Sequence, residues 1–195
     1  WLPFLFSPKA DAEARAQLEE GFALRSPERS PRENFEVALQ LAVIPHPDVE
    51  KAADMVRPVI ALYVGGMGAK GKNFYNDVCR AYGWEAEAEL VQDLYLAGKK
   101  AEAASAIPDE LVEKTTLCGD ESYVRDRLAA FKAAGVTNLN VAPVGGDAAA
   151  TLAAGSLVTS DLASGPLAVA LRKSTMPPTY SGTIWTSPGN CPAAM

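Results

Sequence analysis

The sequence is poor in the residues that build disulfide frameworks, metal centres and basic surfaces. Its 195 residues include three cysteines and one histidine, and 18 lysines and arginines stand against 24 aspartates and glutamates. Cys79, Cys118 and Cys191 lie far apart and form no CxxC pair, so neither a disulfide scaffold nor a zinc site is indicated and a reducing cytoplasm fits best. The formal charge of −6 argues against nucleic acid or an anionic membrane as partner, because both need a basic surface.

Long apolar runs and targeting signals are also missing. No apolar stretch approaches the roughly 20 residues that cross a bilayer, and no charged segment with a cleavage site opens the chain. The apolar content of 48% is that of a globular protein with one core. The chain opens on Trp1 without a methionine, in a segment that is already strand-like, so we expect a piece of a longer protein.

Strands and helices alternate in the predicted order of parallel βαβ units. The apolar patterns predict strands at residues 1–6, 35–44 and 137–142. They predict helices over residues 8–24, 74–81, 85–97, 99–106 and 121–134. Two further helices are predicted to begin at Asp48 and at Pro108. Pro58 is expected to kink or restart the helix that begins at Asp48, and Gly135 is expected to end the helix over residues 121–134. Three strands are too few for a complete (β/α)8 barrel, which needs about 250 residues.

Composition changes after Gly146 to alanine, serine, threonine, glycine and proline. We therefore divide the chain into an ordered part, residues 1–146, and a low-complexity tail, residues 147–195. The tail is expected to be poorly ordered, with weak helix around residues 162–172.

A short stretch between two predicted helices concentrates glycine and lysine. It reads GGMGAKGKN and contributes Gly65, Gly66, Gly68, Lys70, Lys72 and Asn73. Glycines let backbone amides approach an anion, and the lysines supply positive charge that the chain otherwise lacks. The spacing matches neither a Walker loop nor GxGxxG. Two interpretations remain open: a mobile lid that binds an anion, or a connector with solvated lysines.

Other candidate residues follow predicted strands, where barrel enzymes place their sites. Trp1, Pro3 and Ser7 are candidates for lining a substrate or coenzyme cavity, although an aromatic core cluster explains the segment equally well. His46 stands after the strand at 35–44, where it can transfer protons, but its two neighbouring prolines favour an ordinary surface residue. Cys118 is interpreted as a small buried residue. No metal site is predicted, and the catalytic residues are not identified.

Four segments together resemble a known family. They read WLPFLFSP, ALYVGGMGAKGKNFYNDV, VQDLYLAGKKAEAASAIPDELVEKTTLCG and GDESYVRDRLAAFKAAGVTNLNVAPVG. In order and spacing they resemble the C-terminal part of the luciferase-like monooxygenase superfamily, in its branch of oxidoreductases that depend on the deazaflavin coenzyme F420. The resemblance covers residues 1–146 and implies an α/β fold, a partial TIM (β/α)8 barrel made of its C-terminal strands and helices with a helical insertion.

The resemblance also implies an activity. Such enzymes move a hydride between coenzyme F420 and a small organic substrate, and related members are monooxygenases that use reduced flavin (FMN). Coenzyme F420 carries a phosphate and a glutamate tail, so the glycine-rich stretch from Gly65 to Asn73 is assigned to coenzyme binding. The family's catalytic residues are expected before Trp1. The alternative is a non-catalytic fragment that binds a partner, either as a homo-oligomer or with a complementing barrel half.

Overall fold

The computed structural model describes residues 1–8, 11–143 and 168–171. Within these residues four strands form one parallel sheet, in the order β2-β1-β3-β4. They are β1 (Ala38–Pro45), β2 (Leu117–Gly119), β3 (Asn138–Pro143) and β4 (Ala168–Leu171). The predicted strands at 35–44 and 137–142 are therefore confirmed, and they are neighbours in the sheet.

Strand β1 is central because its apolar side chains find partners on both faces of the sheet. Leu39, Leu41 and Val43 are buried toward one core, whereas Ile44, on the other face, belongs to a second core. Gln40 is the exposed exception. The two-residue period of a strand sends alternate side chains to opposite faces, so this mostly apolar run suits a strand with layers on both sides.

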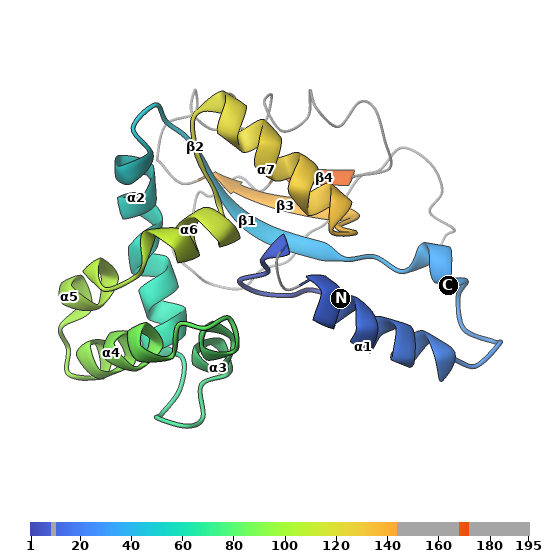
Figure 1. The fold of residues 1–195 in the computed structure, drawn as a ribbon, viewed down its shortest axis with the longest axis horizontal. Coiled ribbons are helices and arrows are strands. Elements are labelled where there is room, and N and C mark those ends of the chain that lie inside the picture. Colours follow the sequence, from blue (N-terminus) through green and yellow to red (C-terminus); the bar gives the residue numbers. More distant parts are fainter. Residues whose placement is uncertain (9–10, 144–167, 172–195) are drawn as a thin grey trace, which may run out of the picture.

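One helix covers the first of these faces, and Figure 1 shows it running along the sheet. It is α7 (Glu121–Ala133), whose Val124, Leu128 and Phe131 are buried against β1 and β3. The Asp120 carboxylate accepts a hydrogen bond from the amide of Tyr123 and so caps the helix, which ends at Gly135 with φ of +84°. The predicted helix and its glycine end are confirmed.

The remaining helices fall into two groups at opposite ends of the strands (Figure 1). Helix α1 (Asp11–Ala23) and the short 3-10 turn η2 (Arg32–Asn34) lie toward the end at which β1 begins. Residues 49–115, called the helical insert, lie beyond the end at which β1 finishes. The insert contains α2 (Val49–Ala61), the π-helical turn η3 (Leu62–Gly66), α3 (Phe74–Ala81), α4 (Glu85–Leu96), α5 (Lys100–Ser105) and α6 (Asp109–Thr115). None of the helices in the described part of the chain is long and apolar enough to cross a membrane.

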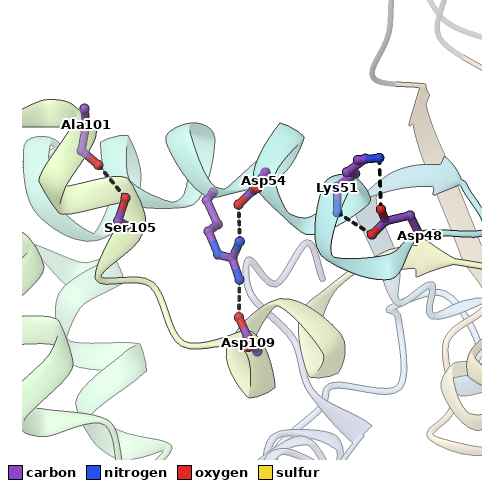
Figure 2. A network of polar contacts seen from close by, with 7 residues as sticks. Asp48, Lys51, Asp54, Ala101, Ser105 and Asp109 are labelled. Carbon is purple, nitrogen blue, oxygen red and sulfur yellow. Dashed lines mark hydrogen bonds and ion pairs between the residues drawn. The ribbon is translucent and has the colours of Figure 1, made fainter.

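The helical insert has a core of its own. Apolar side chains from α2, η3, α4 and α6 pack together, among them Ile60, Val64, Val91 and Leu111. Arg57 on α2, 8% exposed as a residue, forms ion pairs through its guanidinium with Asp54 on its own helix and with Asp109 at the start of α6. Figure 2 labels the two aspartates and marks these pairs as dashed lines. Asp48 caps α2 as predicted. We expected Pro58 to kink or restart this helix; it does not restart there, because α2 includes Pro58, runs on to Ala61 and continues into η3.

The prediction of a strand at residues 1–6 is wrong. The terminal amine of Trp1 donates to the carbonyl of Glu36 and the carbonyl of Trp1 accepts from Ala38, but no ladder follows. Leu5 has φ of +51°, a left-handed conformation that interrupts an extended chain. The strand that pairs with the end of β1 is instead β2, which lies parallel to Val43, Ile44 and Pro45.

The prediction of helix around residues 162–172 is also wrong where the structure describes it. Residues 168–171 form β4, parallel to β3, with Val169 opposite Leu139. Pairing with β3 supplies the backbone with hydrogen-bond partners that no local preference for helix can reveal. The rest of the tail assigned to residues 147–195 lies outside the described residues.

Candidate functional site

Three aromatic rings meet where the N-terminal segment reaches the helical insert. The ring centroid of Phe4 is 4.2 Å from that of Tyr63 and 4.8 Å from that of Tyr75, and the two tyrosine rings are 4.9 Å apart. Tilted and edge-on pairs at such distances are favoured by the ring quadrupoles. Since Tyr63 precedes the glycine-rich stretch and Tyr75 follows it, this aromatic cluster fixes both ends of the stretch to residue 4.

The N-terminal segment reaches both cores because of its bend at Leu5. Phe4 joins the aromatic cluster on the helical insert, whereas Phe6 is buried in the sheet core, with its ring centroid 6.4 Å from that of Phe131. Leu5 is the one non-glycine residue with positive φ in the described part of the chain. Such a conformation costs about 1–2 kcal/mol. The segment is therefore held in a strained shape that links the two halves of the molecule.

The first two glycines of the stretch allow two helices to touch. Gly65 and Gly66 end the π-helical turn η3 against Tyr95 of α4. A Cβ atom on Gly65 would lie 2.6 Å from Cβ of Tyr95 and 2.9 Å from the carbonyl oxygen of Val91. Both distances are too short for any side chain, so close packing of backbone on α4 requires glycine here. The structure gives these two residues a packing role.

Two buried asparagines hold the carbonyl groups of η3. Asn73, 1% exposed, caps α3 with its Oδ1 and donates its amide protons to the carbonyls of Tyr63 and Val64. Asn76, 5% exposed, donates to the carbonyls of Val64 and Ala88, which joins η3 to α4. Asn73 was predicted to bind the coenzyme. Both the oxygen and the nitrogen of its side-chain amide are hydrogen-bonded to backbone groups, so the structure gives it the role of holding the loop.

The rest of the stretch, residues 67–72, forms a surface loop above this base. The amide of Lys72 donates to the carbonyl of Ala69 and closes a turn in which Gly71 has φ of +70°. The loop is tied to α4 twice: the side chain of Gln92 donates to the carbonyl of Gly68, and the ammonium of Lys70 pairs with Asp93. A Cβ on Gly71 would meet open space.

Positive charge is exposed on this loop. The side chain of Lys70 is 58% exposed, and Lys72 is exposed with no ion pair to any residue in the described part of the chain. The two lysines flank Gly71, whose backbone is open to solvent. In a chain with a net charge of −6 this is a local basic site that an anion can approach from one side.

The predicted substrate residues are not brought together. Ser7 is 3% exposed and Pro3 is half-buried in the same segment as Phe4. Trp1, 44% exposed, lies beside the start of β1 and lines a hollow of about 200 Å³ between α1 and the sheet. That hollow is at the opposite end of the strands from the helical insert. Within this segment Phe4 contacts the helical insert, whereas the Trp1 ring lies 5.8 Å from that of Phe6, the neighbour of Ser7, on the side of the sheet core.

His46 and Cys118 lie close together at the carboxyl end of the sheet. Ile44 is the ladder partner of Cys118, and the amide of His46 donates to the carbonyl of Gly119. The ring Nδ1 of His46 accepts from the amide of Asp48, which fixes the ring beside the start of α2. Burial raises the pKa of the Cys118 thiol, so it stays protonated and unreactive as predicted for a small buried residue.

Sequence reasoning missed the residues that shape the loop. Gln92 and Asp93 act on it from α4, and Tyr63 helps bind it to Phe4. Tyr75 and Asn76 were singled out only as polar groups able to bind a substrate or the coenzyme, and their contacts with Phe4 and η3 were not foreseen. Asn76 stands three residues after Asn73, a helical spacing that places two amides on one side of α3 and was a usable signal. Nothing local marks Gln92 or Asp93, because their contacts come from the docking of α4.

Comparison with known proteins gives three findings. A family model described as luciferase-like monooxygenase matches residues 1–138. A Mycobacterium tuberculosis protein provisionally named a coenzyme F420-dependent oxidoreductase is 41% identical over 141 residues, covering 72% of this chain and 40% of the relative. The structure of the coenzyme F420-dependent tetrahydromethanopterin reductase from Methanopyrus kandleri matches with a TM-score of 0.57 and 22% identity, over 80% of this chain and 41% of the reductase. The structural likeness shows a shared fold. This chain spans about two fifths of the length of either relative.

Proposed function

The chain belongs to the luciferase-like monooxygenase family, and on that premise we propose that it is the C-terminal portion of a coenzyme F420-dependent oxidoreductase. In this proposal β1, β2, β3 and α7 are part of a (β/α)8 barrel. Residues 1–146 are the barrel portion, and residues 147–195 are a tail whose residues 168–171 add β4 to the same sheet. The names of the relatives support the coenzyme, and the parallel strands with helices support the barrel.

The observation that carries the coenzyme proposal is the loop of residues 67–72. Coenzyme F420 ends in a phosphate and glutamate tail, and Lys70 and Lys72 flank a glycine that is open to solvent. The base of the loop is rigid because Asn73 and Asn76 hold η3. A fixed base with exposed cations fits an anionic tail, because the base keeps the loop in place while the lysine side chains reach the ligand.

The proposed division of labour follows the general rule for cofactor enzymes. A bound deazaflavin supplies the hydride chemistry, while the protein contributes binding and orientation. In this chain Lys70 and Lys72 would hold the tail by charge. Phe4, Tyr63 and Tyr75 would fix the loop relative to the end of the sheet. Pro3 and Ser7 remain the proposed contacts for a small organic substrate, because Phe4 of the same segment packs on Tyr63 and Tyr75 beside the loop.

The proposal is tested by titrating the purified chain with coenzyme F420 and, separately, with FMN, following coenzyme fluorescence at low ionic strength. Low salt is needed because exposed charges are screened within about 10 Å at 0.1 M. Saturable binding that favours coenzyme F420 is expected. Preference for FMN would move the assignment to the flavin-dependent branch of the family, and binding of neither would leave a non-catalytic piece that associates with a partner.

A matched pair of variants locates the binding. Replacing both Lys70 and Lys72 by alanine is expected to weaken coenzyme F420 binding about tenfold or more, since charged hydrogen bonds contribute about 1.5–3 kcal/mol. The control replaces Lys99 and Lys100 by alanine, which removes the same charge elsewhere on the helical insert. Equal losses in both double variants would mean that net charge, and not the loop, attracts the coenzyme.

A further inference from the structure

The loop of residues 67–72 is fastened to α4 by two contacts of different strength. Gln92 is 5% exposed and donates to the carbonyl of Gly68 over 3.2 Å, so this contact is shielded from water. The ion pair of Lys70 with Asp93 is open to solvent, with 58% and 47% of the two side chains exposed. Exposed ion pairs are weak and easily exchanged. The loop is thus fixed at its base and loosely held at its tip.

The geometry of the tip allows it to move while the base stays in place. Gly71 has positive φ and nothing within 4 Å of the position of a Cβ, so no neighbouring residue packs on this side of its backbone, and glycine itself is free to adopt other backbone conformations. Gly68, by contrast, is packed so tightly that a Cβ would lie 2.5 Å from the carbonyl oxygen of Lys72. The exposed tip of the loop is therefore residues 69–71, which include Lys70.

From these contacts we propose that Asp93 is a latch that competes with the anionic ligand for Lys70. In the free protein the Asp93 carboxylate holds Lys70 against α4. A phosphate or carboxylate group of the ligand takes its place on the ammonium, and the tip swings toward the ligand while Gln92 keeps Gly68 on α4. Asp93 is a positioning residue in this scheme. The identity of the ligand rests on the proposed function, but the latch itself does not.

Two predictions distinguish the latch from a passive surface ion pair. Asp93→Asn keeps the size of the side chain and removes its charge, so Lys70 should be released. Trypsin must draw Lys70 out of its contact with Asp93 to cut the Lys70–Gly71 bond, and we expect Asp93→Asn to speed this cut about threefold. The same variant should bind coenzyme F420 about threefold more tightly, because the competitor and a like charge near the ligand are both gone.

The experiment follows trypsin cleavage at Lys70 by mass spectrometry and coenzyme F420 binding by fluorescence, in the wild-type chain and two variants. The control is Glu102→Gln, which breaks the exposed pair of Lys99 with Glu102 on α5 by the same change of charge. Faster cutting at Lys70 in Asp93→Asn than in Glu102→Gln supports the latch, and equal rates overturn it, whatever the coenzyme does.

The coenzyme-binding measurement decides whether Asp93 competes with the ligand for Lys70. Tighter binding of coenzyme F420 by Asp93→Asn than by the control supports the competition, and equal or weaker binding overturns it. If none of the three proteins binds the coenzyme, the proposed function fails and the competition fails with it, but the cleavage rates still decide whether Asp93 holds the loop. The two failures are thus distinguishable.

Discussion

The sheet core and the helical insert are built by different kinds of contact. The sheet core consists of apolar side chains such as Leu39, Phe131 and Leu139, each fully buried. Most of the buried polar side chains in the described part of the chain lie instead in the helical insert and directly after it; they are Arg57, Asn73, Asn76, Gln92, Thr115 and Thr116. Apolar packing is non-directional, whereas a hydrogen bond specifies one partner. The sheet thus provides the framework, and the insert fixes the shape of a loop.

This difference also appears in how charge is buried. Arg57, whose side chain is 10% exposed, lies between Asp54 and Asp109, and its Nε atom has no hydrogen-bond partner among the described residues. Removing a charge from water is costly, and pairing repays that cost only when the geometry is good. Within the described residues the sheet core contains no comparable ion pair. In the insert, by contrast, the two ion pairs of Arg57 fix the start of α6 against α2.

The largest effect is expected from emptying the sheet core. Phe131→Ala removes a side chain with 0% exposure and should lower the free energy of unfolding by about 3–5 kcal/mol, because a cavity replaces its contacts. Urea denaturation followed by circular dichroism measures this. Leu96→Ala, at a position 51% exposed, is the control and should change stability by less than about 0.5 kcal/mol. Similar losses at both positions would contradict the assignment of the core.

A smaller effect, confined to the insert, is expected where two helices touch. Gly65→Ala places a methyl group against Tyr95 and the Val91 carbonyl, forces η3 and α4 apart and should cost about 1–3 kcal/mol. Gly21→Ala in α1 is the matched control, because its Cβ meets nothing within 4 Å and the change should stabilise the helix by roughly 0.5–1 kcal/mol. Hydrogen exchange should report faster opening of α4 in Gly65→Ala while β1 and β3 keep their protection.

Removing a polar clamp tests the role of the hydrogen bonds directly. Asn76→Leu keeps the approximate shape of the side chain but withdraws its bonds to the carbonyls of Val64 and Ala88, and should cost about 1–3 kcal/mol. Asn34→Leu, at an exposed position, serves as the control. The free energies of unfolding of the two variants are compared. Equal values for Asn76→Leu and Asn34→Leu would contradict the role assigned to these hydrogen bonds.

The smallest expected effect is a dependence of stability on pH, and it should arise in both the helical insert and the sheet region. Hydrogen bonds from the amides of Lys51 and Tyr123 lower the pKa of Asp48 and Asp120, the caps of α2 and α7. A lowered pKa in the folded state means that the stabilisation is complete above the unfolded value of about 3.9 and is lost as the pH falls through the folded value. Melting temperatures should be unaffected by these two groups between pH 7 and 5 and should fall below about pH 4. The double variant Asp48→Asn and Asp120→Asn should show a flatter decline.

Local signals predicted most of the elements but not their contacts. Helix α3 was predicted at its observed bounds, and α7 was predicted through its apolar stripe and Gly135. The π-helical turn η3 and strands β2 and β4 were missed, because each depends on a partner distant in sequence. The same reason hid the role of Gly65. Its glycine character was evident, but the contact that requires it is with Tyr95 on α4.

The candidate site divides in the same way. Sequence composition identified Lys70 and Lys72 as an unusual basic pair, and both are exposed on one loop. Asn73 was predicted to be a ligand contact, whereas its amide bonds to backbone, because an asparagine before a helix can cap it as well as bind a ligand. Composition shows which groups are present, but only the docking of α4 and Phe4 shows which of them face solvent.

The most direct test of the central claim, that the loop of residues 67–72 receives the anionic tail of the coenzyme, compares two ligands. Coenzyme F420 and its deazaflavin chromophore without the phosphate and glutamate tail are titrated into the wild-type chain and into the variant with Lys70 and Lys72 both replaced by alanine. We predict that the wild type prefers the complete coenzyme by about tenfold or more and that the variant loses this preference. An equal preference in both proteins would contradict the claim.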